Sequence, residues 1–107
     1  MKELKAVIRP NKLAALRAAL VAVPGFPGMT VLKGEGCSAT ARTPFRAASI
    51  VEELTDFTPK VQITIVCPDE LVDSLMAAIE KVCTTGQLGD GIVWVTPVEM
   101  AKFLFKS

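Results

Sequence analysis

Residues 60–82, KVQITIVCPDELVDSLMAAIEKV, contain the pattern that decides the fold. At positions 61–65 apolar β-branched residues alternate with polar ones, which is typical of a β-strand with one buried face. Pro68 ends this alternation, and from Leu71 to Val82 apolar residues recur at the spacing of one face of an α-helix. The stretch therefore predicts a strand that leads directly into an amphipathic helix.

The N-terminal part of the chain has the same order of elements. Residues 3–9 alternate with a period of two, and Pro10 and Leu13 follow them with the spacing of Pro68 and Leu71. Leu13 begins a second helical pattern among alanines, which have a high helix propensity. The chain therefore contains a weak internal repeat of two strand–helix units.

Two further strands, at residues 29–33 and 92–95, are predicted by short apolar runs near glycine and proline. The first helix is expected to end near Val23, and Pro97 is expected to open a short helical turn at residues 98–102. The order is then strand, helix, strand, strand, helix, strand. With right-handed crossovers it predicts an α+β, ferredoxin-like βαββαβ fold, in which an antiparallel four-stranded sheet carries two helices on one face.

The chain has 107 residues, and we expect a single domain over residues 1–107. Between about residues 37 and 59 neither periodicity continues, and small, polar and charged residues predominate. This segment is predicted to be a long flexible loop. Unstructured connections longer than about 12 to 15 residues are uncommon in compact domains and usually serve a function.

The second face of the predicted sheet is also partly apolar. Val7 lies on the face opposite to Leu4 and Ile8, and half of all residues in the chain are apolar. Apolar surface of this kind marks a contact surface. We therefore expect this face to be buried against identical subunits in an oligomer.

Composition disfavours several classes of function. Twelve basic residues against eleven acidic ones give no electrostatic reason for binding nucleic acid or a membrane surface. The chain has no His, which removes the usual general base and the commonest metal ligand, so hydrolytic and zinc enzymes are disfavoured. Cys37, Cys67 and Cys83 form no C-x-x-C pair, and the N-terminus lacks the pattern of a signal peptide. A cytoplasmic protein is expected.

The segment TGQLGDG at residues 85–91 lies between a predicted helix and a predicted strand. Its glycines are spaced so that backbone N–H groups could point together at an anion, such as a phosphate group. The alternative is a plain connection whose glycines only provide positive φ angles. It lacks the Lys-Ser/Thr that ends a Walker loop.

Six short motifs, in order along nearly the whole chain, carry a more specific signal. They are MKELKAVIRPNKL (1–13), PGMTV (27–31), KGEG (33–36), DFTPKV (56–61), VCPD (66–69) and TGQLGDG (85–91). Together they resemble the PII family of signal-transduction proteins. The resemblance implies a homotrimer that binds small effectors in the clefts between subunits. It also implies that the long loop, here residues 37–59, docks on a partner protein such as a membrane transporter.

The resemblance also implies where the effector binds. Lys60 corresponds to the lysine that meets a carboxylate of 2-oxoglutarate in typical members. Thr30 corresponds to the residue near adenine, and Gly34 and Gly36 correspond to the base of the loop. Val66 corresponds to the cleft strand, and Gly86, Gly89, Asp90 and Gly91 correspond to the loop on the phosphate side. The implied effector is an adenine nucleotide, AMP, ADP or ATP, or another small anion.

Five positions depart from the family pattern. Cys37 and Ser38 replace an Arg-Gln pair whose glutamine helps to hold magnesium and 2-oxoglutarate. Ile92 replaces a phosphate-binding lysine, and Phe103 and Phe105 replace two arginines. Each lost contact removes about 1.5 to 3 kcal/mol of charge-assisted hydrogen bonding. We therefore expect weaker ATP binding than in typical members, and, because the chain has no Tyr, no tyrosine uridylylation.

These features predict a regulator, not an enzyme, which senses a small cytoplasmic metabolite between subunits and controls a partner through its loop. The alternative is a structural or metal-tolerance trimer similar to the CutA family, in which Cys37 binds a soft metal, because thiolates prefer copper(I) or zinc. An enzyme similar to acylphosphatase is disfavoured, since the chain lacks the pattern Gly-x-Val-x-Gly-Val-x-Phe-Arg.

Overall fold

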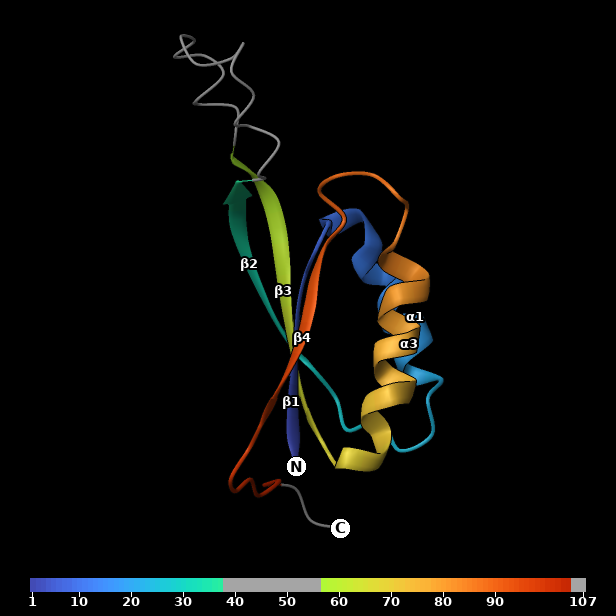
Figure 1. Ribbon diagram of the computed structural model, residues 1–107, viewed down its shortest axis with the longest axis vertical. Helices are drawn as coiled ribbons and strands as arrows, with labels where there is room; N and C mark the ends of the chain where they lie inside the picture. The colour runs from blue at the N-terminus through green and yellow to red at the C-terminus, as the bar shows by residue number, and fades with distance from the viewer. Residues whose placement is uncertain (38–56, 105–107) are drawn as a thin grey trace, which may run out of the picture.

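The computed structural model describes residues 1–37 and 57–104. Within them, strands β1 (Lys2–Ile8), β2 (Thr30–Cys37), β3 (Phe57–Cys67) and β4 (Gly91–Pro97) form a sheet in the order β2-β3-β1-β4. Every neighbouring pair is antiparallel. Helices α1 (Leu13–Val21) and α3 (Val72–Cys83) lie side by side against this sheet (Figure 1). The predicted ferredoxin-like βαββαβ fold is confirmed.

Strand β1 is central because both of its edges are paired, one with β3 and the other with β4. Its alternation places Leu4, Ala6 and Ile8 against the helices, and each is at most 1% exposed. Burial of a Leu or Ile side chain contributes about 1.5 to 3 kcal/mol, so this inner face is a main source of stability. The inner residues of β3, Val61, Ile63, Ile65 and Cys67, extend the same apolar layer.

Both helices begin in the same way. A proline ends the preceding strand, and one turn of 3-10 helix follows, at Pro10–Lys12 before α1 and at Asp69–Leu71 before α3. The helices then bury Leu16 and Leu20 from α1, and Leu75, Ile79 and Cys83 from α3. In the described part of the chain no polar or charged residue is buried with them. The predicted internal repeat therefore corresponds to two equivalent strand–helix units.

The strands are longer than the sequence predicted. β2 continues through Gly34 and Gly36 to Cys37, and β3 already begins at Phe57. Backbone pairing with Lys60 and Thr58 holds the two glycines in an extended conformation and overrides their low strand propensity. Both ends of the predicted 37–59 loop are thus strand, and residues 38–56 lie outside the described residues.

One helix end differs by two residues from the prediction, and one predicted helical turn is absent. Helix α1 ends at Val21 rather than near Val23, where the Val23 N–H donates to the Leu20 carbonyl three residues back instead of to the carbonyl four residues back. Residues 98–102 form no helix. Instead the Val98 N–H donates to the Met1 carbonyl at 3.0 Å, so this backbone group continues the contact between β4 and β1.

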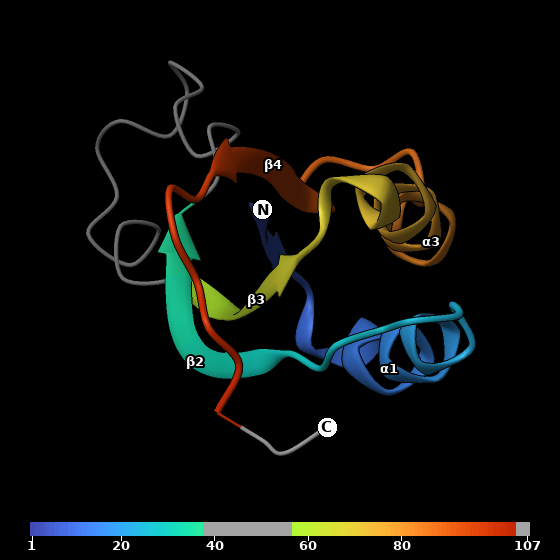
Figure 2. The same ribbon diagram turned by 90° about the horizontal axis from the view of Figure 1, so that it is seen from below.

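The sheet face that points away from the helices carries exposed apolar side chains. Figure 2 shows both helices on one side of the curved sheet. The register places Leu32, Gln62, Val7 and Ile92 in one row across the opposite face. Leu32 is 58% exposed and Ile92 is 62% exposed. We call its three apolar members, Leu32, Val7 and Ile92, the apolar row.

Gly91 gives a direct test of the register between β1 and β4. An added Cβ would lie 1.8 Å from the Val7 carbonyl oxygen, and the φ of Gly91 is +117°. Gly28 has a similar φ of +109°, but nothing lies within 4 Å of an added Cβ, so Gly28→Ala measures the backbone strain alone. That strain costs about 1 to 3 kcal/mol.

We expect Gly91→Ala to lower the free energy of unfolding by at least about 2 kcal/mol more than Gly28→Ala does, because it forces β1 and β4 apart. Urea denaturation at equal protein concentrations measures both. Equal losses for the two variants would contradict the pairing of Ile8 with Gly91.

Candidate functional site

The strand register brings four chain segments together at one end of the sheet. Ile8 pairs with Val61 on one side and with Gly91 on the other. One residue further along, Arg9 therefore lies between Lys60 and Asp90, and Lys60 is itself paired with Gly34. The loop that joins α3 to β4 lies at this same end (Figure 1).

Arg9 and Lys60 hold the loop through its backbone carbonyls. The Arg9 Nε–H donates to the Gly89 carbonyl oxygen at 3.1 Å, and Nη2 donates to the Leu88 carbonyl oxygen at 2.7 Å. Lys60 Nζ donates to the same Gly89 oxygen at 2.9 Å. Two cations thus converge on one neutral acceptor. Gly89 has a φ of +91°, and an added Cβ would lie 3.3 Å from Arg9 Nη2, so this close approach favours glycine.

Asp90 shapes the loop from inside. Its carboxylate accepts hydrogen bonds from the Thr85 N–H at 2.7 Å, from the Gly86 N–H at 3.0 Å and from the Thr85 hydroxyl. Arg9 Nη2 lies 3.7 Å from Asp90 Oδ1. We call the Asp90 contacts with Thr85 and Gly86 the clasp. These hydrogen bonds, chiefly those from Thr85, hold the pKa of Asp90 below its ordinary value.

The clasp limits which amides can meet an anion. The N–H groups of Thr85 and Gly86 point at Asp90, and the Gln87 N–H donates to the Thr85 hydroxyl at 3.3 Å. The predicted anion cradle therefore cannot use these three donors in this conformation. In the described structure, the Leu88 and Gly89 N–H groups donate no hydrogen bond.

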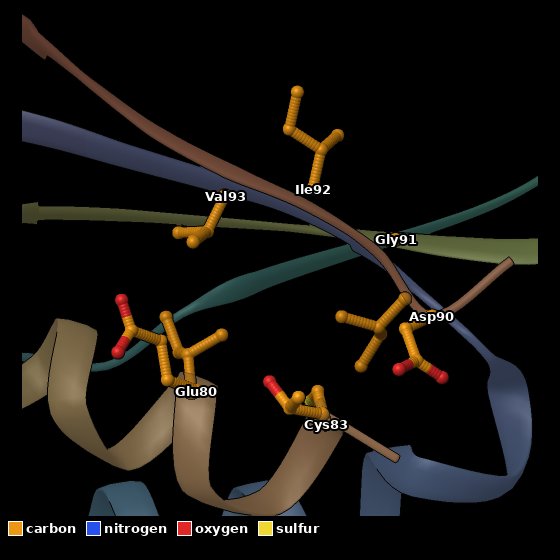
Figure 3. Close-up of a pocket in the computed structure, with 9 residues that line it drawn as sticks. Glu80, Cys83, Asp90, Gly91, Ile92 and Val93 are labelled. Atoms are coloured by element: carbon orange, nitrogen blue, oxygen red, sulfur yellow. The ribbon is translucent and has the colours of Figure 1, made fainter. Parts of the chain in front are cut away.

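A small hollow lies behind the loop, between the end of α3 and β4 (Figure 3). Ile8, Ile79, Cys83 and Val93 give it apolar walls, and Glu80 and Asp90 add carboxylates. Figure 3 shows Val93 turned toward α3 and Ile92 turned to the other side of β4. Since the charged groups of this hollow are carboxylates, it is unsuited to an anion. Lys60 lies instead on the open face, in a second hollow that Val7, Leu32, Lys33 and Glu35 also line, and Arg9 lies next to Lys60 in the strand register.

The structure brings together part of the predicted effector site. Gly34, Gly36, Lys60, Gly89 and Asp90 meet at this end of the sheet, and an added Cβ on Gly36 would lie 3.0 Å from Lys60 Cγ. Gly86 lies in the loop that joins α3 to β4, and Gly91 begins β4 directly after it. Cys37 is the last residue of β2, at the same end of the sheet. Ser38 lies outside the described residues.

Two predicted site residues lie elsewhere in the same chain. Val66 is six residues along β3 from Lys60, which corresponds to about 20 Å of strand. Thr30 pairs with Thr64 and is therefore also near the far end of the sheet. Within one chain, neither residue shares a site with Lys60.

Arg9 is the site residue that the sequence prediction missed. Its position directly before Pro10, at the end of a strand, was visible, but that signal does not say which strand lies beside it. Only the register places it next to Lys60. The carbonyl acceptors of Leu88 and Gly89 were missed as well, because the glycine-rich sequence was interpreted only as a source of N–H donors.

The described residues offer no cluster for a metal ion. They contain no group of three or more His, Cys, Asp or Glu side chains placed to hold one. Cys67 and Cys83 are buried, and burial raises the pKa of both thiols. Cys37 is exposed at the end of β2. No helix in residues 1–37 and 57–104 is long and apolar enough to cross a membrane.

The clasp predicts a pH dependence. Because the pKa of Asp90 is lowered in the folded protein, the contribution of the clasp is complete above 3.8 and is lost as the pH falls below that value. We expect the amide proton shifts of Thr85 and Gly86 to titrate with an apparent pKa below 3.8 in NMR spectra. Asp90→Asn should abolish this titration, whereas Glu99→Gln, on an exposed residue, should preserve it. A midpoint at or above 3.8 would contradict the clasp.

Comparison with known proteins places this chain in a family. The family model described as Nitrogen regulatory protein P-II matches residues 1–104. The chain is 42% identical to the Nitrogen regulatory protein P-II of Azospirillum brasilense, over 92% of this chain and 87% of that protein. It is 42% identical to Nitrogen regulatory protein P-II 1 of Escherichia coli strain K12, over 92% of this chain and 86% of that protein. It is 40% identical to the Nitrogen regulatory protein P-II of Haemophilus influenzae, over 94% of this chain and 88% of that protein. The chain therefore belongs to the P-II family of nitrogen regulatory proteins, which are signal-transduction regulators.

Proposed function

We propose that this chain is a trimeric cytoplasmic regulator that binds a small anionic metabolite next to Arg9 and Lys60, in a cleft between subunits. Binding would change how the segment at residues 37–59 engages a partner protein, such as a membrane transporter. The observation that carries the proposal is the pair of cations on the open face of the sheet, beside the apolar row. Family membership favours this function over the CutA-like alternative, which rested on Cys37.

The position of the cations supports a site between subunits. Side chains at every second position of a strand share a face, so Lys60 lies on the same face as Gln62, and Arg9 on the same face as Val7. A subunit that covers the apolar row would thus end beside the two cations. The site would then be closed by the partner copy.

A trimer also accounts for the two predicted site residues at the far end of the sheet. Thr30 and Val66 cannot reach Lys60 of their own chain. They can complete the site only if the far end of one subunit meets the cation end of the next. We propose that they contact the adenine side of a bound nucleotide in this way.

The departures from the family pattern bear on which nucleotide binds. Ile92, 62% exposed on β4, and Phe103, 37% exposed, offer no charge where the resemblance implies basic side chains. Phe105 lies outside the described residues. Arg9 and Lys60 provide two positive charges, which suits AMP, ADP or a small carboxylate better than ATP.

Calorimetry tests the effector. We expect AMP, ADP, ATP or 2-oxoglutarate to give measurable heat, with ATP bound no more tightly than ADP. Lys60→Met should weaken binding about 10-fold or more, since a hydrogen bond to a charged group contributes about 1.5 to 3 kcal/mol. Lys81→Met, on an exposed residue of α3, is the matched control. Absence of heat with all four compounds would refute the proposed function.

Analytical ultracentrifugation tests the trimer. We expect a particle of about 34 kDa, three times the 11.4 kDa chain. Leu32→Glu should dissociate it, because a charge would be buried in the contact. Val21→Glu is the control, since Val21 on α1 is 56% exposed and Leu32 is 58% exposed. A monomer for the unmodified chain, or a trimer that tolerates Leu32→Glu, would contradict the proposed contact.

A further inference from the structure

The contact between Arg9 and the loop has the geometry of a bound carboxylate. A guanidinium presents Nε–H and one Nη–H as a planar fork that matches two oxygens side by side. In Arg9 this fork is filled by two backbone oxygens, Gly89 O on Nε and Leu88 O on Nη2. Two neutral loop oxygens therefore occupy the Arg9 donors that a carboxylate would occupy.

Lys60 strengthens this comparison. Its ammonium donates to Gly89 O from β3, so the oxygen is shared between two cations that come from different strands. The nearby carboxylate, Asp90, lies 3.7 Å from Arg9 and accepts three hydrogen bonds within the clasp. The two positive charges are therefore matched by one formal negative charge and by two neutral carbonyls.

We propose that the Leu88 and Gly89 carbonyl oxygens act as an internal occupant of the Arg9–Lys60 pair, so that an anion binds the pair in competition with the docked loop. The proposal rests on the proposed function, because it concerns regulation of the same site. An anion that takes the Arg9 fork releases residues 87–89 from the sheet. Anion binding is thereby converted into a movement of the loop next to the base of the 37–59 segment.

Energetics and backbone conformation both permit this exchange. An anion adds Coulombic attraction to Arg9 and Lys60 that a neutral carbonyl does not provide, so an anion can displace the loop. Gly86 and Gly89 have φ angles of +83° and +91°, and glycine changes its backbone conformation without a side-chain clash.

Backbone ¹⁵N relaxation of the full-length chain tests the proposal. Residues 87–89 should have order parameters near 0.85 without added anion and should fall toward 0.6 on saturation with 2-oxoglutarate or inorganic phosphate, where about 0.85 marks a rigid and below about 0.6 a flexible backbone. Sodium chloride at the same ionic strength is the control. Arg9→Lys should loosen the loop without any anion, because lysine keeps the charge but lacks the fork.

Thr85→Val provides a second, independent readout. It removes the hydroxyl that donates to Asp90 and accepts from the Gln87 N–H, without changing charge, and so weakens the docked loop. If the loop competes with the anion, the affinity for 2-oxoglutarate rises about 2- to 10-fold, the equivalent of one hydrogen bond. Thr96→Val, on an exposed residue near the end of β4, should leave the affinity unchanged.

The outcomes separate the two proposals. Heat of binding with loss of order at residues 87–89 and tighter binding by Thr85→Val supports competition. Heat with unchanged or increased order, weaker binding by Thr85→Val, or an ordered loop in Arg9→Lys overturns the competition and leaves the proposed function standing. No heat with any anion overturns both.

Discussion

The register of β1 between β3 and β4 is the constraint on which the rest of the structure depends. It buries Leu4, Ala6 and Ile8 under the two helices, and it sets Arg9 between Lys60 and Asp90 one residue beyond the paired strand. A shift by one residue would turn the buried side chains to the open face and would separate the two cations. The core and the site therefore rest on the same set of backbone hydrogen bonds.

The site in turn depends on which polar groups of the loop are hydrogen-bonded within the loop itself. Asp90 uses the Thr85 and Gly86 N–H groups, and the carbonyls of Leu88 and Gly89 face the cations. A loop that looks like an anion cradle in sequence thus has carbonyls, not amides, at its contact with Arg9 and Lys60. Because these carbonyls contact Arg9 and Lys60, the loop is joined to the end of the sheet and does not form a binding site by itself.

Local sequence pattern and family resemblance predicted the strands, the helices and the topology. Features that depend on contacts between residues far apart in the sequence were not predicted. The alternation at residues 61–65 and the helical spacing after Pro68 are local properties, so the strands, helices and topology followed from them. The extension of β2 through Gly34 and Gly36 depends on pairing with β3, which propensity does not show. The turn expected at residues 98–102 failed for the same reason, because Val98 bonds to Met1.

The residues of the candidate site were also predicted only in part. The resemblance predicted Lys60, Gly89 and Asp90 as site residues, and the structure places them side by side, whereas Arg9 became visible only through the register. Thr30 and Val66 lie toward the other end of the sheet in the same chain. The most direct test of the central claim is an NMR measurement of the Arg9 Hε proton in the protein without added anion. The structure predicts slow solvent exchange and a nuclear Overhauser contact with the Gly89 Hα protons. An Hε that exchanges as fast as in a short peptide, with no such contact, would contradict it.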